Sequence, residues 1–484
     1  MGRILRGTAM RVAFVDRIGW DYRPDTVYQE PLGGSQSAVC YLTAALAQRG
    51  VTVALVNHTT QEGEVLGVSC HHAERLPEGF WQNFDAVVLF NESGLGLVTR
   101  AEILEDTANP CTPLILWTQH DGHQPAMQAL HDVLERTVYD RFVFVSEWQR
   151  QQYLHHFGLE AARTHVLRNA IAPSFAQLPP VAEKEPLVVY TSTPFRGLAE
   201  LLALWPAIHR GFPQARLEVF SSLQVYRQTL EADRAQFGEL YDRCQQLPGV
   251  TYRGAIPQPE LAPVLQKSLV LAYPNTFPET SCIAVLEALA AGCHVVTSAL
   301  GALPETTGGW ATLIPPGETY GGQFVAAVGQ ILREQEALRA DRDRQSAQTK
   351  TDHIWSRRAA QWEAWLQEVC APAAMPADAE ERARAHERRL QFAEAAAIRE
   401  QVYERNPAHW ANTYALARDY RALGYGWGES GLYLQEAWVE AATNPELLWQ
   451  MAIACEAMDD PETAARYWQE AIARCPGLAV LRGA

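Results

Sequence analysis

The sequence predicts two similar α/β domains, each a doubly wound parallel sheet with helices on both faces, followed by an all-helical region. Short apolar segments alternate with helical patterns from about residue 10 to residue 370. A polar linker over 177–186 interrupts this alternation, which then restarts. Beyond Pro376 the strand pattern stops. A chain of 484 residues is also too long for a single hydrophobic core, so several domains are expected.

The first domain is predicted over residues 10–180. Val12–Val15 is its first strand, and a helix over 36–49 follows the glycine pair Gly33-Gly34. Its later strands are predicted at 51–56, 86–90, 113–117, 141–145 and 164–167.

The second domain is predicted over residues 181–353. Its strands are expected at 187–191, 216–220, 249–253, 268–274 and 294–298. A tryptophan-rich helix at 354–370 closes this half of the chain, and we expect it to pack back onto the first domain.

Residues 377–484 are predicted to form tetratricopeptide-like helical repeats. Prolines that end helices recur at Pro407, Pro445 and Pro476, at spacings near the roughly 34 residues of such a repeat. Segments 393–397 and 462–466 each precede an aromatic residue and then a proline, as in the second helix of that repeat. A generic set of helical hairpins is the alternative.

The composition excludes several classes of protein. A formal net charge of -16 argues against a nucleic-acid partner, because binding to phosphates needs a basic surface. No apolar stretch reaches the roughly 18 residues of a membrane span, so no transmembrane segment is expected. The nine cysteines include no C-x-x-C pair, which indicates free thiols in a reducing compartment. We therefore expect a cytoplasmic protein.

Segment 277–292 is the most informative part of the chain. An apolar strand at 268–274 precedes it, and Pro278 keeps Glu279 out of a helix. Thr280 or Ser281 is expected to cap a short helix that ends at Gly292. Ligands of such strand–helix–strand units bind where strands end and helices begin.

Glu279 and Glu287 allow two interpretations. As the acid/base pair of a hydrolase, their carboxyl groups need to lie about 5 to 9.5 Å apart, as in glycosidases. On one continuous helix the two positions lie roughly 12 Å apart. Although a loop position for Glu279 shortens this distance, the spacing suits two contacts on one extended ligand better. Glu287 could accept ribose hydroxyls, and Glu279 could hold sugar hydroxyls.

Gly33-Gly34 is a second candidate binding element. A glycine pair that opens a helix lets a phosphate approach backbone N–H groups at the positive helix end. An ordinary pair of loop glycines is the alternative. The pattern is not G-x-G-x-x-G, so we do not expect a dinucleotide site.

Together these motifs resemble those of family 4 glycosyltransferases with the GT-B fold, over about residues 10–370. In the second domain the resemblance lies in the E-x7-E pair Glu279…Glu287, the strand 271–274 and Gly292. In the first domain it lies in Gly33-Gly34-Ser35, 143–146 and 167–170. The resemblance implies two Rossmann-like domains and a retaining glycosyltransferase. Its co-substrate would be a nucleotide-diphosphate sugar, with no further cofactor.

The resemblance also implies roles for single residues. Glu287 would meet the ribose and Glu279 the transferred sugar. The pyrophosphate would face the N–H groups of Ser281, Cys282, Ile283 and Ala284, which the positive end of a helix favours as well. Arg196 matches a family lysine and would bind phosphate, with a surface arginine as the alternative. The family's upstream arginine is Ser192 or Thr193 here, so one cation is missing.

His120 matches a family histidine near the anomeric carbon. A hydrogen bond to a sugar hydroxyl or to the acceptor is its expected role. A satisfied loop histidine is the alternative, and Asp121 and His123 are rival candidates. We expect no metal site, because Asp341 and Asp343 lie in a charged stretch typical of a solvated helix face.

The resemblance therefore implies a retaining glycosyltransferase, and we expect it to be metal-independent. Its acceptor is either a protein that the helical repeats dock, or a surface polysaccharide or lipid-linked glycan, with the repeats recruiting other enzymes. The third alternative is an inactive GT-B scaffold, against which the presence of Glu279, Glu287 and Arg196 speaks.

Overall fold

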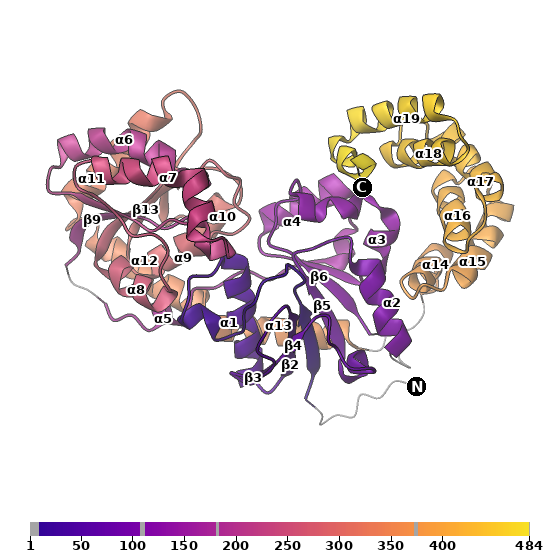
Figure 1. Cartoon of the computed structure of the whole chain (residues 1–484), viewed down its shortest axis with the longest axis horizontal. Coiled ribbons are helices and arrows are strands. Elements are labelled where there is room, and N and C mark those ends of the chain that lie inside the picture. Colours follow the sequence, from indigo (N-terminus) through magenta and orange to yellow (C-terminus); the bar gives the residue numbers. More distant parts are fainter. Residues whose placement is uncertain (1–8, 107–111, 181–182, 372–375, 484) are drawn as a thin grey trace.

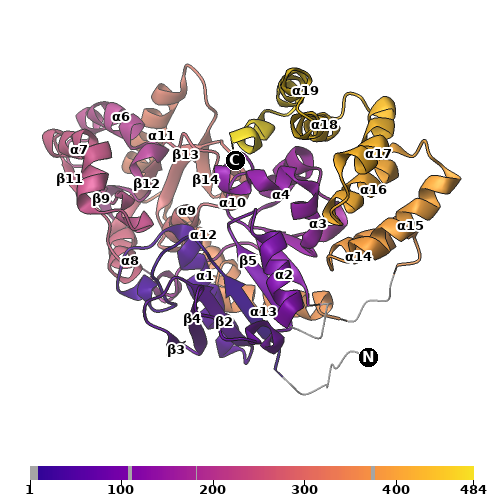
Figure 2. The same ribbon diagram turned by 45° about the vertical axis from the view of Figure 1, so that its right-hand side comes forward.

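The computed structural model describes residues 9–106, 112–180, 183–371 and 376–483, and it confirms the predicted fold class. Two α/β domains lie side by side, and an all-helical region forms an arc beside the first of them (Figure 1). In the rotated view of Figure 2 the helical region again lies on the side of the first domain.

The first sheet has eight strands in the order β3-β4-β2-β1-β5-β6-β7-β8, all parallel except for the β3–β4 pair. The strands are β1 Arg11–Val15, β2 Thr52–Asn57, β3 Gly63–Val65, β4 Val68–His72, β5 Ala86–Phe90, β6 Leu114–Trp117, β7 Arg141–Phe144 and β8 Thr164–Val166. The α-helices are α1 Gly34–Gln48, α2 Gly96–Asp106, α3 Val133–Val138, α4 Glu147–Phe157 and α5 Pro173–Ala176, and the 3-10 turns are η1 Thr26–Tyr28, η2 Phe80–Asn83, η3 Pro125–His131 and η4 Ala161–Arg163.

The second sheet has six parallel strands in the order β11-β10-β9-β12-β13-β14. They are β9 Glu185–Tyr190, β10 Arg216–Val219, β11 Val250–Tyr252, β12 Ser268–Tyr273, β13 His294–Ser298 and β14 Ala311–Ile314. The helical elements are η5 Pro194–Arg196, α6 Leu198–Gly211, η6 Leu223–Tyr226, α7 Leu230–Gln246, α8 Gln258–Lys267, α9 Ile283–Ala290, α10 Leu303–Thr307, α11 Tyr320–Glu334 and α12 Arg339–Asp352.

The helix α13 (Trp355–Val369) returns from the second domain to the first sheet. The ring of Trp362 lies 5.9 Å from that of Phe14 on β1 and 5.1 Å from that of Trp117 on β6. Where the chain crosses between the domains, the amide of Ile171 donates to the carbonyl of His353 across 3.0 Å. One continuous apolar core therefore runs through both domains by way of the two crossing segments.

The helical region consists of six consecutive helices that pair in sequence order. They are α14 Ala379–Glu387, α15 Phe392–Arg405, α16 Trp410–Ala422, α17 Trp427–Glu440, α18 Pro445–Ala457 and α19 Pro461–Arg474, followed by the turn η7 Pro476–Gly483. Segments 393–397 and 462–466 lie on α15 and α19, the second helices of their hairpins. Pro445 begins a helix instead of ending one, because proline fits the first helical position without losing a hydrogen bond. The tetratricopeptide assignment stays a prediction.

The helical region is anchored to the first domain at several points. Val133 on α3 packs against its apolar core, and Arg136 forms a 3.0 Å ion pair with Glu446 at the start of α18. The turn η7 contacts η3 of the first domain. Figure 1 shows the resulting arc, whose open side faces α3. In the described part of the chain, no helix is long and apolar enough to cross a bilayer.

Candidate functional site

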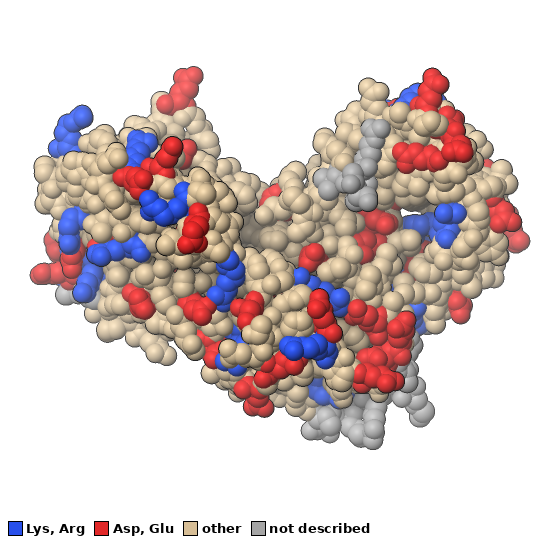
Figure 3. All heavy atoms as spheres, viewed as in Figure 1, with Lys and Arg blue, Asp and Glu red and all other residues tan. Residues whose placement is uncertain are grey.

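A cleft of about 570 Å³ lies between the two α/β domains, and loops that follow strands of both sheets line it. In Figure 3 a hollow of largely uncharged surface lies between the second domain on the left and the first domain with the helical region on the right, while acidic and basic side chains are mixed over the rest of this face. The cleft contains every site residue that the sequence predicts: Gly33, Gly34, His120, Arg196, Glu279, Ser281, Cys282, Ile283, Ala284 and Glu287.

Glu279 lies in the loop between β12 and α9, as Pro278 predicts, and it is only 4% exposed. Its carboxylate accepts a 2.7 Å hydrogen bond from Arg196 Nη1 and a 2.5 Å hydrogen bond from the hydroxyl of Tyr273. Burial opposes the charge of Arg196, but the Glu279 carboxylate raises the pKa of this guanidinium well above its usual value. The two groups therefore form a buried ion pair.

Two glycines hold the loops that carry this ion pair. Gly197 follows Arg196 with φ +121°, and a Cβ there would lie 2.1 Å from the carbonyl oxygen of Pro274. Gly301 has φ +60°, and a Cβ there would lie 2.5 Å from the carbonyl oxygen of Glu279. Only glycine tolerates both the backbone conformation and the close contact at these positions.

The cap of α9 differs from the prediction. Cys282 is the N-cap residue and makes no side-chain cap hydrogen bond. Thr280 instead donates to the carbonyl oxygen of Gln119 in the first domain, across 2.7 Å. This contact between domains takes the hydroxyl that the sequence assigns to capping. The start of α9 therefore has no side-chain cap bond from Cys282, and Ser281, Ile283 and Ala284 are partly exposed there.

Glu287 lies in the second turn of α9 and is 2% exposed. Its carboxyl group accepts a hydrogen bond from the amide of Ala172, a residue of the crossing segment, across 3.2 Å. Burial raises the pKa of Glu287 to about 8, although the bonds from Ala172 and Gln258 oppose the shift. The carboxyl group is therefore mostly protonated at neutral pH when the cleft holds no ligand.

His120 follows β6 and belongs to the wall that the first domain contributes. Burial lowers the pKa of His120 to about 4, so the imidazole is neutral at pH 7. Its Nδ1 atom is buried without a hydrogen-bond partner in the part of the chain that the structure describes. A ligand hydroxyl is the kind of group that could satisfy it.

The glycine pair opens α1, with Gly33 as its N-cap residue. A side chain on Gly33 would meet the ring of Tyr226 from the second domain at 3.1 Å, and one on Gly34 would meet Ile283 at 3.7 Å. The sequence predicts that phosphate approaches here. The structure places the second domain against this turn, so the glycines also serve the contact between the domains.

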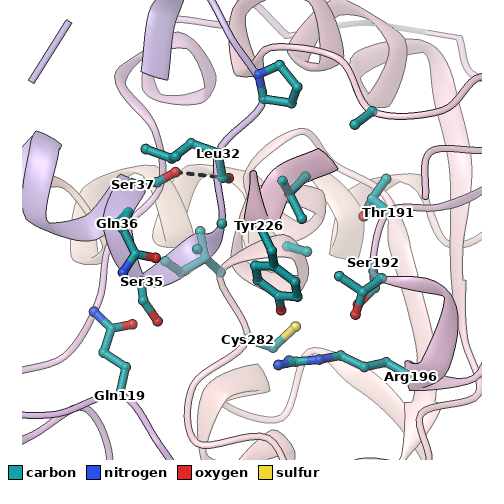
Figure 4. Close-up of a pocket in the computed structure, with 18 of the residues that line it drawn as sticks. Leu32, Ser35, Gln36, Ser37, Gln119, Thr191, Ser192, Arg196, Tyr226 and Cys282 are labelled. Atoms are coloured by element: carbon teal, nitrogen blue, oxygen red, sulfur yellow. Dashed lines mark hydrogen bonds between the residues drawn. The ribbon is translucent and has the colours of Figure 1, made fainter. Parts of the chain in front are cut away.

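Sequence reasoning missed Tyr226 and Tyr273. Tyr273 ends β12, and Tyr226 lies in η6, the turn that follows β10. Both therefore lie at the carboxyl end of a parallel strand, where ligands of such sheets bind. This position after a predicted strand is the feature of the sequence that could have identified both tyrosines. Figure 4 shows Tyr226 in the middle of the cleft, between Ser35 and Gln119 on one side and Thr191 and Ser192 on the other.

Several direct contacts hold the domains together around the cleft. Glu305 of α10 accepts hydrogen bonds of 3.1 Å from the amides of Glu147 and Trp148, at the start of α4 in the first domain. Arg168 pairs with the same carboxylate at 2.8 Å. On the other side of the cleft Arg227 forms an ion pair with Glu30. Together with the Thr280 and Glu287 contacts, these bonds join the two domains directly around the cleft.

The second domain resembles a known protein family. Residues 185–334 match the family described as "Glycosyl transferases group 1", so the second domain is a group 1 glycosyltransferase domain. No curated protein sequence matches the chain.

Solved structures share the fold of the chain. Sucrose-phosphate synthase from Thermosynechococcus elongatus is 18% identical with a TM-score of 0.57, over 75% of this chain and 100% of that one. HepE from Anabaena, in complex with UDP and glucose, is 15% identical with a TM-score of 0.55, over 74% and 100%. A glycosyltransferase from Rickettsia africae ESF-5 is 10% identical with a TM-score of 0.55, over 75% and 100%. At these identities the likeness shows the GT-B fold.

Proposed function

We propose that the protein is a retaining, metal-independent glycosyltransferase whose donor is a nucleotide-diphosphate sugar. One observation carries this proposal: two buried carboxyl groups and one arginine lie near the start of α9, which has no side-chain cap, in the cleft between the two domains of the GT-B fold. A helix start favours a diphosphate. The group 1 match of residues 185–334 and the UDP bound by HepE support a donor of this class.

In the proposed complex Glu287 accepts the ribose hydroxyls and Glu279 holds the sugar. Arg196 binds the diphosphate, together with the amides of residues 281–284 at the start of α9, and stabilises the negative charge that develops on the leaving group. His120 hydrogen-bonds to a sugar hydroxyl or to the acceptor. A front-face mechanism, in which the departing phosphate helps to deprotonate the acceptor, needs no protein base, metal or further cofactor.

The donor is testable by calorimetry with UDP-, GDP- and dTDP-sugars. We expect one base to bind clearly more tightly than the others. Glu279→Ala is expected to abolish transfer while nucleotide binding largely survives, because the carboxylate contacts the sugar and not the nucleotide. Glu185→Ala is the matched control, since it breaks an exposed ion pair with Arg216 at the amino ends of β9 and β10. Loss of nucleotide binding in folded Glu279→Ala would contradict this division of roles.

The acceptor is either a protein or a glycan. We favour a protein that docks on the helical region, since stacked helical hairpins commonly present peptide-binding surfaces. The alternative is a surface polysaccharide or lipid-linked glycan, with the helical region recruiting other enzymes. Deletion of residues 377–484 should keep donor hydrolysis and lose a protein acceptor. The deletion should be combined with Val133→Ser, because Val133 packs against the helices that are removed and its apolar side chain would otherwise be left uncovered.

Two outcomes would redirect the proposal. If the shortened chain still modifies its acceptor fully, the docking role of the helical region is wrong. If the full chain binds none of the donor nucleotides, it is an inactive GT-B scaffold. The eight described cysteines are free thiols, which supports a cytoplasmic location for the proposed enzyme.

A further inference from the structure

The charges in the cleft leave a donor diphosphate short of positive partners. Among the described residues that line the cleft, Arg196 is the only lysine or arginine. Its guanidinium is already paired with Glu279 at 2.7 Å. A diphosphate brings at least two negative charges into this space. A further hydrogen-bond donor opposite the start of α9 would therefore stabilise it.

Tyr226 is in the right place to supply that donor. Figure 4 shows its hydroxyl directed toward Cys282, the N-cap residue of α9, and toward the Arg196 guanidinium. Among the residues drawn in Figure 4, none forms a hydrogen bond with this hydroxyl. The residue is only partly buried, so a ligand can reach it.

Contacts from the first domain hold the Tyr226 ring. A Cβ on Gly33 would lie 3.1 Å from one of its carbons, and the ring of Trp20 lies 6.1 Å away at an angle of 33°. The neighbouring Arg227 pairs with Glu30 of the first domain. The hydroxyl is therefore fixed over the start of α9 only while the two domains are in contact.

We propose that the Tyr226 hydroxyl binds the phosphate next to the sugar in the donor diphosphate, opposite the start of α9 and Arg196. This inference rests on the proposed function. Under this inference the turn after β10 supplies a further residue that binds the donor. Diphosphate binding then depends on the contact between the two domains. The residue acts by a hydrogen bond to a charged oxygen, and it does not transfer a proton.

The test compares Tyr226→Phe with the unchanged protein, since phenylalanine keeps the ring contacts and removes only the hydroxyl. Among UDP, GDP, dTDP and ADP, the diphosphate that the unchanged protein binds most tightly is used, with the monophosphate of the same base. A hydrogen bond to a charged group typically accounts for roughly a ten- to hundredfold change in affinity. We expect the diphosphate affinity to fall by about tenfold or more, and the monophosphate affinity to stay the same.

The outcomes separate this inference from the proposed function. If Tyr226→Phe binds the diphosphate as tightly as the unchanged protein, the hydroxyl has no role. If it loses mono- and diphosphate equally, the tyrosine is structural, and the inference is again wrong. If the unchanged protein binds none of the four diphosphates, the proposed function fails, and this inference fails with it. Tyr425→Phe, at an exposed position in the helical region, is the matched control.

Discussion

Replacement of Glu287 by glutamine is expected to stabilise the ligand-free protein. Glu287 is 2% exposed, and burial raises the pKa of its carboxyl group to about 8 from the 4.5 of an exposed glutamate. In the folded protein the group holds its proton across neutral pH, whereas in the unfolded chain it ionises near pH 4.5. Glutamine has the shape of the protonated acid and never ionises, so it avoids this cost.

The magnitude follows from the two pKa values. The pKa of Glu287 is raised in the folded state, so its contribution to stability is fully present below pH 4.5 and is lost as pH rises toward pH 8. Each pH unit in this window costs about 1.4 kcal/mol of unfolding free energy. Relative to glutamate, glutamine should therefore add about 1 kcal/mol at pH 5, about 3 kcal/mol at pH 7 and about 4 kcal/mol at pH 8.

The assay is urea unfolding of both proteins at pH 5, 7 and 8, followed by tryptophan fluorescence and circular dichroism. Glu239→Gln on α7 removes an exposed carboxylate and serves as control, with an expected change below about 0.5 kcal/mol at every pH. The more stable Glu287→Gln protein should bind the donor more weakly, since it has lost an acceptor for ribose hydroxyls. Equal stability of the glutamine and glutamate proteins at pH 8 would refute the reasoning.

Three further changes test the loops that line the cleft. Arg196→Ala should lower the unfolding free energy by about 3 kcal/mol in urea titrations, because it leaves the buried Glu279 carboxylate without its cation; unchanged stability would contradict the ion pair. Gly301→Ala should cost at least about 1 kcal/mol and weaken donor binding in calorimetry, because the new Cβ would strike the backbone of Glu279. His120→Asn should lower transfer without moving the pH profile between pH 6 and 8, because burial keeps the pKa of His120 near 4; a profile that shifts would show that the imidazole titrates there.

The sequence predicted those features whose causes are local. Pro278 and Gly292 bracket α9 because proline restricts the residue before it to extended conformations and glycine adopts the positive φ that follows a helix end. The two glutamates therefore fall on the loop and on the helix, as expected. The apolar strands of both sheets are likewise visible as short runs of buried residues.

Features that depend on contacts distant in sequence were not predicted. Thr280 bonds to Gln119 of the first domain instead of capping α9, and no local pattern encodes that partner. The strands β3, β4 and β14 were missed because they are only partly buried, so their apolar pattern is weak. Tyr226 was missed because its neighbours Gly33 and Trp20 belong to the other domain.

The cleft carries almost no net charge when it holds no ligand, because the charges of its ionisable side chains balance. The charges of Arg196 and Glu279 cancel, and Glu287 keeps its proton, so the ligand-free protein buries little net charge. In the proposed complex a donor diphosphate would change this balance, because its negative charge would compete with Glu279 for Arg196 and free that carboxylate to accept sugar hydroxyls. Nucleotide binding at one end of the site would thereby prepare the sugar site at the other end, and the same arginine would couple the two.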